Sequence, residues 1–161
     1  RLETVVAQLD GGESVSICVG NPSEEADVIA LVDATKTRFG KVDILFANED
    51  EAIALYESES FDDAVSVLQN SCDIVVITRG ANGSLIINGD DIFEIDAEPG
   101  VNVVDTTGAG DQYAAGFLYG YTQGMTLQSC ARLGSMAAAE VISHIGPRPA
   151  VKYADLIKTA A

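Results

Sequence analysis

The sequence predicts an α/β fold in which helices flank a mostly parallel sheet and a β-hairpin follows the parallel strands. Three observations support this. Short apolar runs alternate with longer helical patterns along the chain. The run 73–78 (Asp-Ile-Val-Val-Ile-Thr) is continuously apolar at its centre, as in a buried parallel strand. Asn88-Gly89-Asp90 supplies hairpin turn chemistry between two further runs. With 161 residues, we expect residues 1–161 to form a single domain.

The first half of the chain begins with a strand at 14–19. Asn21, Pro22 and Glu24 then occupy the N-cap, first and third positions expected of a helix start. This helix should end near Phe39, because Gly40 follows as a stop signal. The remaining elements are a strand at 42–47, helices at 48–56 and 60–69, the strand at 73–78, and a hairpin of 84–87 with 91–95. A short strand at 101–104 and helices at about 109–123, 127–143 and 151–160 complete the prediction.

Composition excludes several function classes. The 9 Lys and Arg against 25 Asp and Glu give a net charge of −16, which would repel phosphate backbones and anionic membranes. We therefore expect no nucleic-acid and no membrane partner. No apolar run approaches ~18 residues, and the N-terminal residues do not resemble a secretory signal. Three widely spaced cysteines without a CxxC motif favour reduced thiols in a cytoplasmic protein, and the one histidine argues against a zinc site.

The segment 105–111 (Asp-Thr-Thr-Gly-Ala-Gly-Asp) is the strongest candidate for a functional site. It is expected to connect the end of a strand to the start of a helix. The backbone N–H groups of residues 108–111 should point out of the first helical turn, where the helix dipole favours an anion. Gly108 and Gly110 allow a phosphate to approach the backbone closely. A carboxylate at Asp111, beside this anion hole, suits removal of a proton from an attacking hydroxyl group during phosphoryl transfer.

Other interpretations of this turn remain open. The two glycines could simply form a tight turn, with Asp111 capping a helix. A Walker A motif is absent, because Gly40-Lys41 is followed by Val42. A Rossmann oxidoreductase is disfavoured because Tyr113 stands where the third glycine of GxGxxG is required.

The string 105–111, with the small-residue helix that follows, resembles the second signature of the ribokinase-like (PfkB) family of carbohydrate and nucleoside kinases. The resemblance implies that Asp111 is the catalytic base, and that Gly108, Ala109, Gly110 and Asp111 supply the anion hole. It also implies a ribokinase-like fold, of which this chain would hold only the C-terminal half. Some strings look most similar to bacterial adenosine-kinase-like members.

Two upstream motifs fit the same family. Asn48 and Glu51 resemble its N-x-x-E motif, which would help to place phosphates and Mg²⁺, largely through water. The alternative is a helix cap, since Asn is a favoured N-cap and Glu a favoured third residue. The segment 78–83 (Thr-Arg-Gly-Ala-Asn-Gly) resembles the family's nucleotide-contacting turn, with Thr78, Gly80 and Gly83 as contacts. Its alternative is a plain turn before the hairpin.

The segment 137–149 resembles the family's last nucleotide-flanking helix and loop. In many members this loop helps to hold a potassium-like ion together with the residues that correspond to Asp105 and Thr107. This sequence departs from the family at Pro147, where alanine is frequent, and the proline alters the backbone freedom of the loop.

Taken together, the resemblance implies an ATP-dependent kinase that phosphorylates a hydroxyl group of a sugar or nucleoside, including adenosine, with ATP, Mg²⁺ and K⁺ as bound groups. The acceptor-binding half and the lid of the family would be absent. We therefore expect either a missing N-terminal half or a homodimer as the partner, and weak or no activity from this chain alone. The alternative is a truncated, non-catalytic nucleotide-binding module.

Overall fold

A computed structural model describes residues 25–55, 57–69 and 71–153 of the chain. The chain divides into two compact units, residues 1–43 and 44–161, which are described separately. The single domain expected for residues 1–161 therefore stays a prediction.

The first unit is described through one helix, α2 (Glu25–Phe39). It ends as predicted at Gly40, whose φ is 87° and whose N–H donates to Lys36 O at 2.8 Å. A left-handed backbone of this kind is accessible to glycine without steric cost. The predicted strand at 14–19 and the helix start at 21–24 lie outside the described residues.

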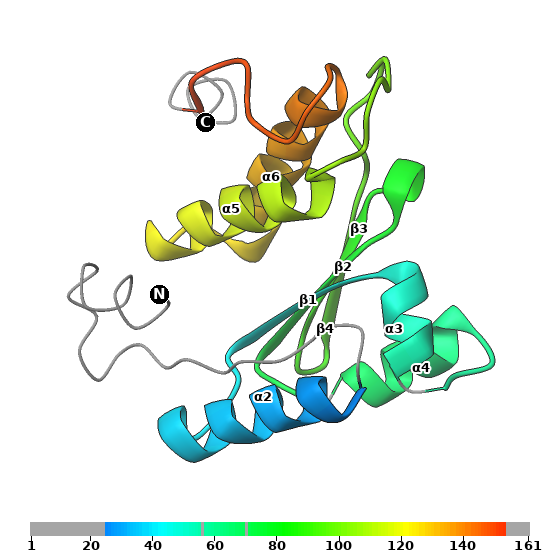
Figure 1. The fold of residues 1–161 in the computed structure, drawn as a ribbon, viewed down its shortest axis with the longest axis vertical. Coiled ribbons are helices and arrows are strands. Elements are labelled where there is room, and N and C mark those ends of the chain that lie inside the picture. The colour runs from blue at the N-terminus through cyan, green and yellow to red at the C-terminus, as the bar shows by residue number, and fades with distance from the viewer. Residues whose placement is uncertain (1–24, 56, 70, 154–161) are drawn as a thin grey trace. The chain divides into compact units, whose positions relative to one another are not determined.

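The second unit contains a four-stranded sheet in the order β1-β2-β3-β4, with β1 (Ile44–Asn48), β2 (Ile74–Thr78), β3 (Ser84–Asn88) and β4 (Asp91–Ile95) (Figure 1). β1 and β2 are parallel, whereas β2–β3 and β3–β4 are antiparallel. The α/β class and the hairpin are confirmed. The sheet is mixed, and its parallel part among the described strands is the pair β1–β2.

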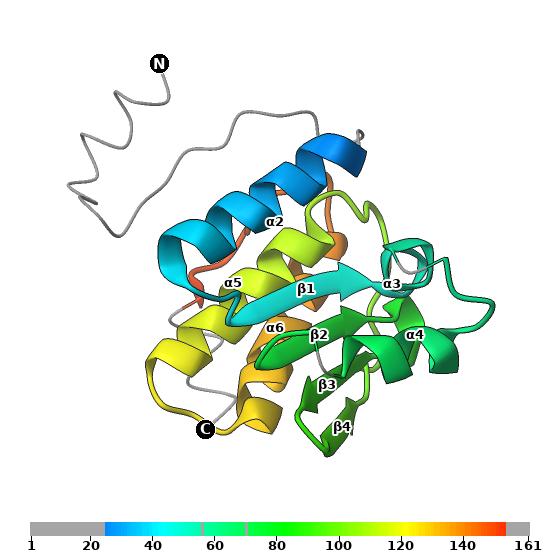
Figure 2. The same ribbon diagram turned by 90° about the horizontal axis from the view of Figure 1, so that it is seen from below.

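Helices cover both faces of this sheet (Figure 2). On one face, α3 (Glu49–Leu55) and α4 (Phe61–Leu68) pack against side chains of β2 and β3 through a buried core of Ala52, Ala64, Leu68, Val75, Ile77, Leu85 and Ile87. On the other face, α5 (Ala109–Thr122) and α6 (Leu127–Ile142) bury Ile74, Val76, Ile86, Tyr113, Phe117, Cys130 and Ala131. Alternate residues of β2 and β3 thus face opposite layers, as the two-residue period of a strand requires.

Small residues bring α5 and α6 into close contact. A methyl group built on Gly116 would lie 2.6 Å from Leu133 O, and one on Gly134 would lie 2.8 Å from Tyr113 O. This packing explains the run of small residues after the Gly-rich turn. It fixes α5, and therefore the turn that precedes it, against the helix whose end carries the 143–153 segment.

One prediction in this unit differs from the structure, and a second falls largely outside the described residues. Residues 101–104 form no strand. Val104 and Asp105 donate their N–H groups to Ile142 O, at 2.8 and 3.3 Å, and none of the described strands pairs with them. Val103 and Val104 are accordingly exposed. The helix predicted at 151–160 falls almost wholly outside the described residues. Within the described parts of the chain, no helix has the length and apolar character needed to cross a membrane.

Candidate active site

A pocket of about 790 Å³ opens where the parallel strands end. Its wall combines the ends of β1 and β2, the start of α3, the 80–83 turn, the 97–103 loop, the first turns of α5 and the second half of α6. In α/β proteins, ligands bind characteristically outside the carboxyl ends of parallel strands. The predicted residues that line this pocket are Asn48, Glu51, Thr78, Gly80, Gly83, Ala109, Gly110 and Asp111.

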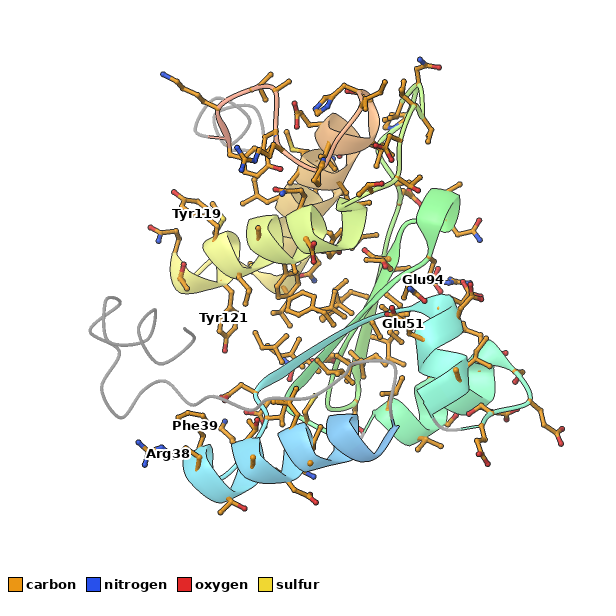
Figure 3. The ribbon with its side chains drawn as sticks, in the orientation of Figure 1. Arg38, Phe39, Glu51, Glu94, Tyr119 and Tyr121 are labelled. Carbon is orange, nitrogen blue, oxygen red and sulfur yellow. The ribbon has the colours of Figure 1, made fainter. Side chains whose placement is uncertain are left out.

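The parallel register brings two of the predicted motifs together. Asn48 and Thr78 are Cα partners at the last paired position of β1 and β2. Asn48 also begins α3, where its Oδ1 accepts from Glu51 N–H at 2.8 Å, while Asn48 N–H donates to Glu51 Oε2 at 2.8 Å. This is a capping box. The helix-cap interpretation is therefore confirmed, and both capping residues also line the pocket; Figure 3 shows Glu51 at the start of α3.

Arg79 links the turn after β2 to α3. Its Nε lies 3.2 Å from Glu49 Oε2, and its guanidinium carbon lies 4.5 Å above the ring of Phe61. Its backbone N–H donates to Gly83 O at 2.8 Å and closes the turn. Gly83 itself has a φ of 82°, and a methyl group there would lie 2.0 Å from Ile95 O. The glycine is thus required by the fold at the place where it also lines the pocket.

The Gly-rich turn forms the start of α5 and differs from the prediction at one of the four N–H groups of residues 108–111. Gly108 precedes α5 with a φ of 81° and provides no side-chain cap. Ala109 N–H donates to Thr106 O at 3.2 Å, and Gln112 N–H donates to Gly108 O at 3.0 Å. Within the described chain no acceptor meets the N–H groups of Gly108, Gly110 and Asp111. Three of the four predicted donors are therefore available, and the fourth is engaged in the turn.

Gly108 lies against the segment after α6. A methyl group on Gly108 would sit 2.6 Å from Pro147 Cβ. Gly108 is not part of the pocket lining, whereas Ala109, Gly110 and Asp111 are. Gly108 is thus placed in the turn beside the pocket by both its backbone conformation and its close packing.

Asp105 and Thr107 lie near this turn but outside the pocket lining. Asp105 Oδ1 accepts from Thr107 N–H, and Oδ2 accepts from Gly146 N–H, both at 2.9 Å. The side chain of Thr107, followed by the N–H groups of Gly146 and Thr107, lowers the pKa of Asp105 to about 2. Asp105 is therefore a carboxylate at neutral pH that joins the Gly-rich turn to the 143–153 segment.

Several lining residues were not among the predicted site residues. Tyr113 Oη donates to the buried Ser84 Oγ at 2.7 Å, and burial raises the pKa of Tyr113 to about 12. Ser135, Ala138, Ala139 and Ile142 follow a helical spacing of three, four and seven residues on α6, which is the signal that could have assigned them to one face. Ala97, Glu98 and Gly100 come from a loop without such a signal.

Metal-ligating side chains are sparse at this site. Across residues 25–55, 57–69 and 71–153, no three His, Cys, Asp or Glu side chains form a group that could hold a metal ion. Cys72 and Cys130 are unpaired thiols, and Cys18 lies outside the described residues. A hard cation here would therefore depend on few protein ligands.

Residues 13–152 match the family model described as pfkB family carbohydrate kinase. The chain belongs to the pfkB family. This membership agrees with the arrangement of the pocket. Its lining includes the three segments that resemble family motifs, which are the Gly-rich helix start, the Asn48–Glu51 box and the 78–83 turn.

Relatives support the same assignment. A cytidine kinase of Thermococcus kodakarensis is 38% identical over 129 residues, which cover 78% of this chain and 46% of the relative. The crystal structure of adenosine kinase from Sinorhizobium meliloti superposes with a TM-score of 0.76 at 42% identity, covering 87% of this chain and 43% of that one. A probable sugar kinase from Rhizobium etli gives a TM-score of 0.75 at 42% identity, with 86% and 42% covered. These matches confirm the ribokinase-like fold, and the chain spans about half the length of the pfkB relatives it matches.

Proposed function

We propose that this chain is the phosphoryl-donor-binding and catalytic half of an ATP-dependent kinase that phosphorylates a hydroxyl group of a sugar or nucleoside. One observation carries the proposal. The N–H groups of Gly110 and Asp111 have no acceptor in the described chain, and they border the pocket together with the Asp111 side chain. The helix start can bind the anionic phosphates, and the exposed carboxylate can accept the proton of the attacking hydroxyl group. Phosphoryl transfer uses both functions.

Asp111 would act as the general base. Its carboxylate belongs to the first turn of α5, where the helix dipole stabilises negative charge. It would accept the proton of the acceptor hydroxyl group as that oxygen attacks the terminal phosphorus of ATP, while the bond from this phosphorus to the bridging oxygen breaks and ADP leaves. The first-turn N–H groups would donate to the phosphoryl oxygens on which charge develops, without reorganisation during the reaction.

The remaining predicted residues would bind the donor. Asn48, Glu51, Thr78, Gly80 and Gly83 also line the pocket and would contact phosphates directly or through water. Glu51 uses Oε2 in the capping box, so Oε1 remains for a water ligand of Mg²⁺. Mg²⁺ retains several waters and is bound by few carboxylates plus substrate phosphates, which fits a pocket lined by Glu51, Glu98 and Asp111. Mg²⁺ bound there would neutralise part of the negative charge on the ATP phosphates during transfer.

Asp105 and Thr107 would hold a monovalent cation beside the turn. The ionised carboxylate of Asp105 accepts from the N–H groups of Thr107 and Gly146 and would supply the negative charge for a cation. The residues present are compatible with K⁺ as a structural ion of the turn and the 143–153 segment.

The acceptor belongs to the sugar and nucleoside class. The similar proteins are named cytidine kinase, adenosine kinase and probable sugar kinase, so their acceptors differ while the family is shared. We propose adenosine as the first acceptor to test, because the adenosine kinase is 42% identical over the matched region. The missing half of the family fold would supply most acceptor contacts, either as an N-terminal segment or through a homodimer.

The test compares the wild-type chain with Asp111→Asn, each assayed alone and within any longer protein that contains it. ADP release is measured with adenosine, cytidine and ribose, and ATP binding is measured by calorimetry. We expect Asp111→Asn to lower turnover about 100-fold or more, because a general base contributes that much, while ATP affinity changes less than about twofold.

Asp90→Asn is the matched control, because Asp90 is exposed at the hairpin tip, outside the pocket. Near-normal turnover in Asp111→Asn would exclude Asp111 as the base. ATP binding without ADP release from any acceptor, in every form of the protein, would instead support the non-catalytic nucleotide-binding module.

A further inference from the structure

The segment after α6, residues 143–153, contacts the Gly-rich turn at several points. Gly146 N–H donates to Asp105 Oδ2, and the ring of Pro147 packs against Gly108. One further residue on the turn side also reaches this segment. Gln112 follows the proposed base directly, and its side chain makes two hydrogen bonds to residues 147 and 153.

The orientation of the Gln112 amide follows from its partners. Nε2 lies 3.1 Å from Pro147 O, which can only accept, so the amide must present its donor there. Oε1 is then left to accept, and the hydroxyl group of Tyr153 donates to it. Burial, followed by the charge of Glu140, raises the pKa of Tyr153 to about 12, so the phenol remains protonated and able to donate at neutral pH.

The far end of the segment is fixed to α6 by a separate contact. Glu140 Oε1 accepts from Ala150 N–H at 2.8 Å and from Val151 N–H at 3.2 Å. The side chain of Glu140 is only 10% exposed. Because the segment is bonded to α6 at residues 150 and 151, Tyr153 presents a hydroxyl group from an anchored backbone rather than from a free tail.

We propose that Gln112 and Tyr153 are positioning residues: together they hold the first turn of α5 against the 143–153 segment, so that the free N–H groups of Gly110 and Asp111 keep the arrangement that a phosphate needs. This inference rests on the proposed function for its consequence, although the contacts themselves do not. Neither side chain lines the pocket, so both act through the turn.

The test uses Gln112→Met and Tyr153→Phe in the full chain. Gln112→Met has similar length but removes both hydrogen bonds, and Tyr153→Phe removes one. We expect the dissociation constant for ADP to rise about tenfold in the first variant and about threefold in the second, since each lost bond is worth up to about a factor of ten. Tripolyphosphate, a probe without a base or sugar, should weaken by the same factors, because only phosphate contacts change.

Gln128→Met is the control, because Gln128 is an exposed α6 residue whose side chain makes no hydrogen bond within the described chain. Amide hydrogen exchange is followed at Gln112 and Gly146, whose N–H groups donate to Gly108 O and Asp105 Oδ2. Exchange of the backbone N–H groups at positions 112 and 146 should be faster in Gln112→Met and unchanged in Gln128→Met.

The outcomes separate this inference from the proposed function. Unchanged exchange at Gln112 and Gly146 would overturn the positioning role whatever the binding data show. Faster exchange with unchanged affinity for ADP and tripolyphosphate would show that these contacts do not affect phosphate binding, which overturns that part of the proposal. The same conclusion follows if the wild-type protein binds neither probe. Normal turnover in Asp111→Asn would exclude Asp111 as the general base. Weakened ADP binding in Gln112→Met would still support the positioning role.

Discussion

The backbone N–H of Asn48 donates to Glu51 Oε2, and the N–H of Glu51 donates to Asn48 Oδ1, each at 2.8 Å. This reciprocal pair caps α3 and at the same time faces the pocket. A substitution can therefore change stability, binding or both, and the two effects must be measured separately.

Glu51→Gln should separate the effect on stability from the effect on binding. The Gln carbonyl can still accept the Asn48 N–H, so we expect the free energy of unfolding to change by less than about 0.5 kcal/mol. The charge that favours Mg²⁺ is lost, so the enhancement of ADP binding by Mg²⁺ should shrink severalfold. Urea denaturation and calorimetry with and without Mg²⁺ measure the two quantities. Full retention of the Mg²⁺ enhancement would leave Glu51 with a capping role alone, and Asn48→Ala, which should cost about 1 kcal/mol, calibrates that role.

Gly108→Ala and Gly110→Ala should differ sharply in stability. At Gly108 the φ of 81° is strained for alanine, and the methyl group would meet Pro147 Cβ at 2.6 Å, so a cost of at least about 1–3 kcal/mol is expected. A methyl group on Gly110 meets no protein atom within 4 Å. This variant should fold with wild-type stability or better, yet bind ADP more weakly, because the methyl group stands at the phosphate-facing turn. Equal stability of the two variants would contradict the turn geometry.

Tyr113→Phe should destabilise the contact between α5 and the sheet. The variant leaves Ser84 Oγ, in a residue 2% exposed, without its hydrogen-bond donor, and we expect a loss of about 1–2 kcal/mol in the free energy of unfolding. Tyr119→Phe serves as the control, because Tyr119 is 45% exposed and projects from α5 away from the pocket lining (Figure 3). A loss of the same size in both variants would show that the Ser84 hydrogen bond contributes little.

The same tyrosine predicts an alkaline effect. Burial raises the pKa of Tyr113 from 10.0 to about 12, so the fold favours the neutral phenol. The stability that this preference provides is complete below pH 10 and is lost as the pH rises through about 12. An absorbance titration should show late ionisation of Tyr113 and Tyr153, and Tyr113→Phe should remove one late-ionising phenol. Wild-type ionisation of every tyrosine near pH 10 would refute the burial argument.

Much of the candidate site was predictable because its signals are local. The Gly-rich turn, the helix start at residue 109 and the Asn48–Glu51 box depend on residues within a few positions of one another. The hairpin of β3 and β4 likewise follows from its tip. Local backbone preferences and first-turn capping decide such features, and a sequence pattern reports them directly.

The tertiary structure alone decided which of these features meet. The register that pairs Asn48 with Thr78, the contact of Gly108 with Pro147, and the Tyr113–Ser84 hydrogen bond join residues at least 29 positions apart. The apolar run 101–104 was predicted as a strand but pairs with none of the described strands, and the N–H group of Val104 donates to Ile142 O instead. Local sequence does not decide which carbonyl oxygen accepts a given backbone N–H group, and long-range packing does. The sequence by itself therefore determined most of the described elements of this unit, because their signals are local. Only the packing of α5, α6 and the sheet decided which of them meet at the pocket.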